Sequence, residues 1–276
     1  VVVEESATTA SPWTVLVNEM RLTDCVVRLK TPDVQLHLAI DSAALEGFST
    51  APGAEGASFR FKGRVNDAPL EIHLDRPQGA PHLDLGGTLS LAGFDLGRLA
   101  KLLAPAVQPF TGTAGVDGRL RFSLPAEGPR AEYEGSLELG EVDIGVAGTA
   151  IDEKSLVWQG KASYTGGGAG GTVSVNGTLD GQGLVLAHGA GSREPLLRLE
   201  QFATSGIEAV TGQRLAVQRL QTKGLALRVD GDLPLTVQVP EVVVGTVTSG
   251  DWQSFAAGSV SVRNTRIVPQ QDKGEM

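Results

Sequence analysis

The chain has 276 residues, with 23 Lys and Arg against 32 Asp and Glu, and its formal net charge is −9. That charge disfavours nucleic acid and anionic membrane surfaces as direct electrostatic partners. The few aromatic residues, 3 Trp, 2 Tyr and 8 Phe, argue against a stacking platform for sugars or single-stranded nucleic acid.

The predicted elements are mostly strands, because apolar and polar residues alternate with a period of two almost to the end of the chain. The run 34–41 is the clearest: Val34, Leu36, Leu38 and Ile40 fall on one face, and Gln35, His37 and Asp41 fall on the other. Later runs place the following residues on an apolar face: Phe59, Phe61, Val65, Leu70, Ile72, Leu74, Leu120, Phe122, Leu124, Leu156, Trp158, Val173, Val175, Leu225, Leu227, Val229, Leu233, Leu235, Val237, Val239, Val260 and Val262.

About seventeen strands are predicted in this way, spaced as in a series of hairpins. Alternation is typical of a half-buried antiparallel sheet, whereas a parallel sheet shows continuous apolar runs. Turn dipeptides separate the strands, although some of them are also compatible with bulges inside strands. They are Asn66-Asp67, Asp75-Arg76-Pro77, Asp117-Gly118, Asn176-Gly177, Asp180-Gly181 and Asp230-Gly231-Asp232.

Only the segment 94–104 has the spacing of a helix of useful length. Its leucines recur at helical intervals, Asp95 is a candidate N-cap and Pro105 would end the helix. A short amphipathic helix of this length can close one end of a structure, but it cannot cover a long sheet.

An internal repeat is visible when residues 17–29 are laid over residues 217–229. Both segments read apolar, spacer, apolar, a small polar turn, and then apolar-x-apolar. The segments 197–210 and 260–268 follow the same pattern. A repeat of this kind indicates a sheet that grows by the addition of similar units.

The sequence shows no motif that would carry catalysis. Gly166, Gly168 and Gly171 have the spacing of a dinucleotide fingerprint, but the residues that follow, 172–175, predict a strand rather than the helix that holds a pyrophosphate. The carboxylates Asp152 and Glu153 are expected at a loop-like position in water. We therefore expect no enzyme activity and no catalytic residues.

Metal and cofactor sites are not expected either. His37, His73, His82 and His188 have no partner at a spacing typical of metal ligands, and Cys25 is the only cysteine. His37 and His73 are predicted to lie exposed on the polar faces of their strands. Cys25 is predicted to be a buried, inert thiol.

So many strands with one apolar face must shield that face from water, since each Å² of apolar area left exposed costs about 25 cal/mol. The sheet could fold on itself as a sandwich, close into a barrel, or curl into a groove occupied by something apolar. The alternation is compatible with all three arrangements.

Three segments resemble the AsmA-like proteins of Gram-negative envelopes. Residues 13–29 look like the recurring strand unit of that family, and 94–105 is similar to its short "phenylalanine, x, leucine" helix. Residues 111–122 are similar to its glycine-spaced strand. Residues 133–144 and 197–229 have the same style, so that the likeness extends over most of the chain.

This resemblance implies a mainly β fold, an extended and curved antiparallel sheet that forms an apolar groove, with a β-sandwich as the alternative. It implies a periplasmic protein that a segment outside this chain anchors to the inner membrane, and that conducts phospholipid acyl chains between the inner and outer membranes in support of envelope integrity. The alternative function is a structural or adhesive module of an envelope or surface protein. The expected lining of the groove is Val34, Leu36, Leu38, Ile40, Phe59, Phe61, Val65, Leu70, Ile72, Leu120, Phe122, Leu225, Leu227, Leu235 and Val237.

The chain is expected to form a single β-rich region over 1–276, as a fragment of a longer protein. Its sub-units would be 1–92, 93–150 and 151–276. The expected partner is a phospholipid or another lipid with acyl chains, with no nucleic acid and no cofactor.

Overall fold

A computed structural model describes residues 14–31, 35–49, 56–77, 83–102, 107–125, 127–146, 148–167, 171–188, 195–229, 235–251 and 254–269. The described part contains fourteen strands and one short 3-10 helix. The elements are β1 (Leu16–Lys30), β2 (Gln35–Ser49), β3 (Ala57–Val65), β4 (Ala68–Arg76), β5 (Leu83–Asp95), η1 (Leu96–Leu102), β6 (Val107–Leu124), β7 (Arg130–Val146), β8 (Thr149–Thr165), β9 (Thr172–His188), β10 (Pro195–Val210), β11 (Arg214–Val229), β12 (Leu235–Ser249), β13 (Ala256–Arg263) and β14 (Arg266–Pro269).

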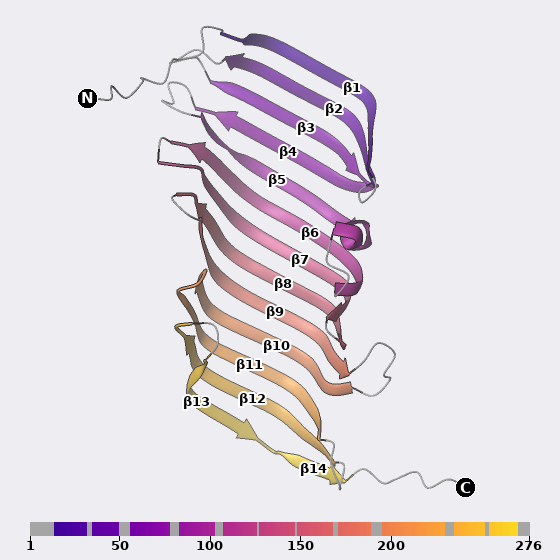
Figure 1. Cartoon of the computed structure of the whole chain (residues 1–276), viewed down its shortest axis with the longest axis vertical. Coiled ribbons are helices and arrows are strands. Elements are labelled where there is room, and N and C mark those ends of the chain that lie inside the picture. The colour runs from indigo at the N-terminus through magenta and orange to yellow at the C-terminus, as the bar shows by residue number, and fades with distance from the viewer. Residues whose placement is uncertain are drawn as a thin grey trace, which may run out of the picture.

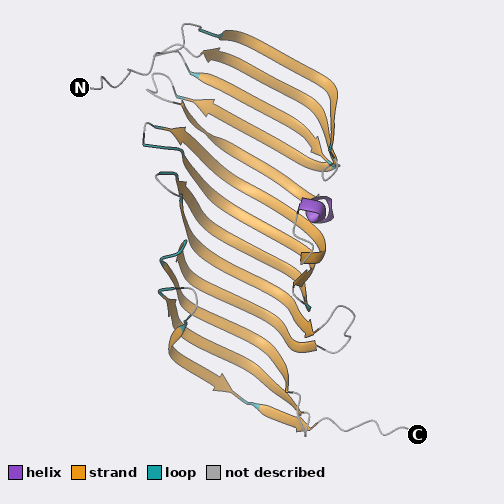
Figure 2. Ribbon diagram, viewed as in Figure 1, coloured by secondary structure: helices purple, strands orange, loops and turns teal. Residues whose placement is uncertain are grey.

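All fourteen strands belong to one antiparallel sheet (Figures 1 and 2). Strands β1 to β13 lie side by side in chain order, and β14 continues beside β12 after β13 ends. The sheet is open, with β1 at one end of its long axis and β13 and β14 at the other. The prediction of a mainly β, antiparallel fold is therefore confirmed. The alternative of a β-sandwich is wrong for the described part, because it forms one layer and not two.

The strands are fewer and longer than the sequence predicted. Most contain 13 to 18 residues, for example β6 with 18. The predicted turns Asp117-Gly118, Asn176-Gly177 and Asp180-Gly181 lie inside β6 and β9, so they do not end strands. The turn at Asn66-Asp67 is confirmed: both residues have positive φ (47° and 72°), as a two-residue hairpin turn requires. The turn expected at 230–232 lies outside the described residues.

The predicted helix over 94–104 is wrong in type and length. Asp95 ends β5, and only Leu96–Leu102 forms a helix, of 3-10 type. Asp95 does act as a cap, because the main-chain N–H of Gly97 donates a hydrogen bond to its Oδ1 (2.9 Å). The predicted end at Pro105 lies outside the described residues. Short 3-10 segments are frequent as connectors, and this one joins β5 to β6.

The strands from β7 to β14 share one line of bends, where the backbone enters the left-handed region. Its members on alternate strands are Glu141 (φ 48°), Gly183 (φ 80°), Gly224 (φ 63°) and Asn264 (φ 55°). The pairs on either side of the bend at Gly224 keep the same register, as Lys223 opposite Gln201 and Leu225 opposite Leu199 show, whereas beside Glu141 the register between β6 and β7 shifts by one residue. The bends therefore turn the strands without breaking the sheet.

Each bend shifts the phase of the alternation by one residue. In β10, Leu199 is buried, Glu200 and Gln201 are both exposed, and Phe202 turns inward again. In β2, Asp41 and Ser42 are exposed between two buried residues. The "small polar turn" of the sequence repeat is this bend: Asp24 (φ 51°) in β1 and Gly224 in β11 occupy equivalent positions of the repeat. The repeat is thus a repeat of strand geometry.

A row of glycines crosses the middle of the sheet. Gly118, Gly135, Gly160 and Gly177 lie opposite one another on β6, β7, β8 and β9. A Cβ atom at Gly160 would overlap the carbonyl oxygen of Asn176, and the other three glycines are equally close to neighbouring backbone. These positions accept only glycine, because the strands approach one another too closely for a side chain.

We expect Gly160→Ala to destabilise the protein by about 1–3 kcal/mol, the usual cost of forcing an extra carbon into a packed site. Gly86→Ala is the matched control, because a Cβ there would have no atom within 4 Å. Thermal unfolding followed by circular dichroism measures both variants. Equal midpoints for Gly160→Ala and Gly86→Ala would contradict the close approach of β8 and β9.

Candidate functional site: the uncovered apolar face

One row of residues runs across the strands from β1 to β13, and it is almost entirely apolar. Residues directly opposite in register lie on the same face, so the pairing alone defines the row. Its members, from β1 to β13, are Cys25, Ile40, Gly63, Leu70, Leu91, Val116, Leu137, Trp158, Leu179, Thr204, Leu220, Val244 and Val260.

Thr204 is the one hydroxyl in this row, and the structure satisfies it locally. Its Oγ1 donates to the carbonyl oxygen of Leu179 (3.1 Å) and accepts from the N–H of the same residue (2.9 Å). The hydroxyl therefore does not interrupt the apolar character of the row. We call this row and the rows beside it on the same side of the sheet the apolar face.

The structure brings the predicted lining residues onto this face. On the N-terminal strands, Leu38 lies opposite Val65, and Phe61 lies opposite Ile72. The other predicted residues of β2, β3, β4 and β6 share the face by alternation or register, and they are Leu36, Ile40, Phe59, Leu70, Leu120 and Phe122. On the C-terminal strands, the residues are Leu225, Leu227, Leu235 and Val237. Val34 lies outside the described residues. Whether these residues line a binding site stays a prediction.

No second layer covers the apolar face within the described part of the chain. None of its large side chains is less than 2% exposed. One small cluster of Ile40, Ala43 and Phe61 is buried, and Cys25 packs against it half-buried rather than buried as predicted. At both ends of the sheet the apolar side chains are more open: Val27 in β1 is 51% exposed and Val260 in β13 is 61% exposed.

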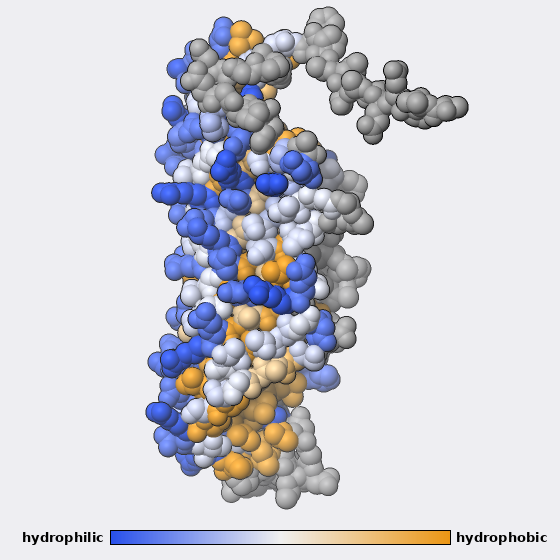
Figure 3. All heavy atoms as spheres, turned by 90° about the vertical axis from the view of Figure 1, so that its left-hand side faces the viewer, coloured by the Kyte–Doolittle hydropathy of each residue, from blue (hydrophilic) through white to orange (hydrophobic). Residues whose placement is uncertain are grey.

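Figure 3 shows the molecule from the side of the β6–β7 and β8–β9 connections, with hydrophobic residues in orange. They form an interrupted band along the long axis, between hydrophilic side chains, and the band is broadest near the C-terminal strands. The surface is open rather than enclosed.

The opposite face is polar and carries charges of both signs. A hollow of about 950 Å³ on this face is lined by side chains that include Arg60, Glu71, His73, Glu134 and Lys161. The lining holds as many carboxylates as cations, and Lys161 Nζ forms an ion pair with Glu134 (2.9 Å). The hollow is therefore polar, and the charges of its lining balance. His73, like His37, is half-buried on this face and not exposed as predicted, because the rows of side chains are dense.

An aromatic pair lies across the glycine row on the apolar face. The rings of Tyr133 and Trp158 stack with their centres 6.1 Å apart. The hydroxyl of Tyr133 lies 2.6 Å from the carbonyl oxygen of Ser136 and 2.9 Å from that of Asp117. The side chain of Tyr133 thereby covers Gly118 and Gly135, which have no side chains to cover their own backbone. Burial raises the pKa of the Tyr133 hydroxyl.

Glu153 is a buried carboxylate at the line of bends, and the prediction of a solvated loop position is wrong. It belongs to β8 and is 7% exposed. Its Oε1 accepts a hydrogen bond from the N–H of Gln182 (2.8 Å), beside the bend at Gly183. Burial raises the pKa of Glu153, and hydrogen bonds from the N–H groups of Gln182 and Ser155 partly oppose this. The carboxylate satisfies backbone donors that the bend leaves unpaired.

The described residues contain no grouping of three or more His, Cys, Asp or Glu that could hold a metal ion. Among the helices of the described part, none has the length and apolar character needed to cross a membrane. The segment after residue 171 is strand β9, as predicted, and not the helix of a dinucleotide site. Comparison of the chain with protein-family models, curated proteins and solved structures gave no match.

We expect Glu153→Gln to flatten the dependence of stability on pH. The pKa of Glu153 is higher in the folded protein than in the unfolded chain, so folding binds a proton. The stability that this proton contributes is complete below the pKa of the glutamate in the unfolded chain, 4.5. It is lost as the pH rises through the pKa of Glu153 in the folded protein. The glutamine variant has no carboxyl group to titrate, so it does not lose this stability as the pH rises.

The measurement is the urea midpoint of both proteins between about pH 4 and pH 8. Asp143 has a pKa raised by burial and by the neighbouring Asp152, so a part of the pH dependence remains in the variant. Glu138→Gln, at an exposed position, is the control and should keep the wild-type slope. An unchanged slope in Glu153→Gln would show that Glu153 is solvated.

Proposed function

We propose that this chain is a non-catalytic module that binds lipid acyl chains on its apolar face and conducts phospholipid along it. The observation that carries the proposal is the apolar row that crosses thirteen strands with no layer above it. A soluble sheet of this size normally buries such a face against a second sheet or helices. Here the described part of the chain supplies neither.

The energy of binding follows from the area that a lipid would cover. Each CH₂ group removed from water contributes about 0.8 kcal/mol. A chain lying on an open face is covered on one side, so roughly half of this is gained per CH₂ group. Such binding needs area and no specific polar contact, and the apolar face supplies area along its whole length.

The dimensions also favour this function. Thirteen strands spaced about 4.8 Å apart extend over roughly 60 Å. One leaflet of a bilayer has a hydrocarbon thickness of about 15 Å, half of the full core. The apolar face is therefore several acyl chains long, and lipids can occupy it in succession.

The proposed place of action is the periplasm, with attachment to the inner membrane and transfer towards the outer membrane. This part of the proposal rests on the resemblance to AsmA-like proteins. The alternative function is a structural or adhesive module whose apolar face packs on another protein, and the same surface would serve it. The two differ in what the face binds.

We expect Leu227→Asp to lower the amount of acyl chain bound at the C-terminal strands and to leave the protein folded. Leu227 is already 40% exposed, so an aspartate there can reach water without the cost of a buried charge. Gln238→Asp is the matched control, because it adds the same charge on the polar face. Gln238 lies on β12, opposite Ala226 of β11. Binding of a radiolabelled phospholipid and the melting temperature are measured for each variant.

Phe61→Asp is expected to unfold the protein, since Phe61 is 8% exposed within the buried cluster. The proposal requires lipid loss with a melting temperature within a few degrees of wild type in Leu227→Asp. If wild type holds no lipid, or if Gln238→Asp loses as much lipid as Leu227→Asp, the lipid-binding proposal fails. The structural or adhesive module is then the proposed function.

A further inference from the structure

A small hollow of about 270 Å³ lies where the ends of β1 and β2 meet the β3–β4 turn and η1. It is lined by Arg28, Leu29, Lys30, Gln35, Leu36, His37, Asn66, Asp67 and Arg98. Its lining includes residues from both faces of the sheet. Leu29 and Leu36 lie opposite each other on the apolar face, and Arg28 and His37 lie opposite each other on the polar face.

The hollow gathers positive charge in a chain of net charge −9. Arg28, Lys30 and Arg98 contribute three cations, and Asp67 contributes one carboxylate. Arg98 also forms an ion pair with Asp95, whose Oδ2 lies 3.4 Å from its Nε. Three cations against these two carboxylates leave a net charge of +1. Among the described residues, neither Arg28 nor Lys30 forms an ion pair.

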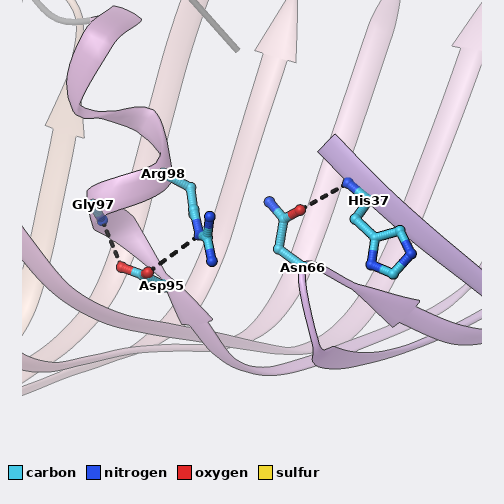
Figure 4. A network of polar contacts seen from close by, with 5 residues as sticks. All are labelled: His37, Asn66, Asp95, Gly97 and Arg98. Carbon is cyan, nitrogen blue, oxygen red and sulfur yellow. Dashed lines mark hydrogen bonds and ion pairs between the residues drawn. The ribbon is translucent and has the colours of Figure 1, made fainter. Parts of the chain in front are cut away.

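Hydrogen bonds to the main chain of His37 fix Asn66 at the wall of the hollow. The N–H of His37 donates to Oδ1 of Asn66 (2.8 Å), and the N–H of Asn66 donates to the carbonyl oxygen of His37 (2.7 Å). With its oxygen held in this way, the side-chain amide presents its NH₂ group on the side where Arg98 lies (Figure 4). The side chains of Arg98 and Asn66 point toward each other across the gap.

An arginine, a fixed amide and two further cations around one hollow are the donors that an oxyanion needs. Arginine binds phosphate through two parallel N–H···O bonds, and an amide NH₂ adds a neutral donor. Leu29 and Leu36 at the same place extend the hollow into the apolar face, so a phosphate held there has apolar surface beside it for an attached chain.

We propose that this hollow binds the phosphate group of a phospholipid whose acyl chain lies on the apolar face. The inference rests on the proposed function and adds to it the chemical class of the ligand, an anionic phosphate ester. The phosphate accepts hydrogen bonds from Arg28, Arg98 and Asn66, and Lys30 adds charge. The site sets the position at which a lipid enters or leaves the N-terminal end of the apolar face.

The test uses probes that differ only in phosphate: lysophosphatidic acid and the monoacylglycerol with the same acyl chain. Wild type is expected to bind the phosphate probe at least tenfold more tightly. The double variant Arg28→Gln, Arg98→Gln should lose this preference and keep its affinity for monoacylglycerol. Arg198→Gln, which removes one charge from an exposed position of β10, is the control and should keep the preference. Melting temperatures show that all variants are folded.

Inorganic phosphate is the third probe, and it identifies the source of the ligand. If inorganic phosphate competes with lysophosphatidic acid but not with monoacylglycerol, the hollow binds phosphate itself. No competition shows that it needs the attached lipid. An equal preference in wild type and the double variant, or an equal loss in Arg198→Gln, would overturn this site and leave the acyl-chain proposal intact. Failure to bind monoacylglycerol would instead overturn the acyl-chain proposal.

Discussion

A sheet one layer thick cannot bury its own apolar face, and the rest of this structure follows from that constraint. Hydrogen bonds between neighbouring strands hold the sheet together along its length, whereas only a small cluster around Phe61 resembles a core. The stability of such a protein is therefore distributed over the strand pairs, as in repeat proteins. Any apolar molecule that covers the face adds the burial that a second layer would supply in a sandwich.

Local devices shape the sheet where side-chain packing cannot. Bends at Gly183 and Gly224 turn the strands while their register is preserved. The buried carboxylate of Glu153 accepts the N–H of Gln182 beside one of these bends. The aromatic ring of Tyr133 lies over glycines whose strands are too close to carry side chains. The carboxylate of Glu153 gives backbone N–H groups at the bend an acceptor. The side chain of Tyr133 covers glycine backbone that would otherwise face water.

The sequence predicted the fold class and the faces well, because a period of two holds on either side of each bend. It placed Leu36, Leu38 and Ile40 correctly on one face. It split the strands too often, because a dipeptide such as Asn176-Gly177, which lies inside β9, looks like a hairpin turn when the partner strand is unknown. Leu91, Val116 and Leu137 were missed as members of the central row, since register across strands is a long-range property. The buried state of Glu153 was missed for the same reason, and the hollow around Arg98 depends on where η1 lies.

The most direct test of the central claim is to map where an acyl chain lies on the protein. A phospholipid with a photoactivatable group in its chain is bound, irradiated and located by mass spectrometry of the digested protein. The account predicts adducts on the apolar face, at residues such as Leu197, Leu199, Leu225, Leu227 and Val237. Adducts on polar-face residues such as Arg198, Gln238 and Lys223, or none above those on an unrelated protein, would contradict it.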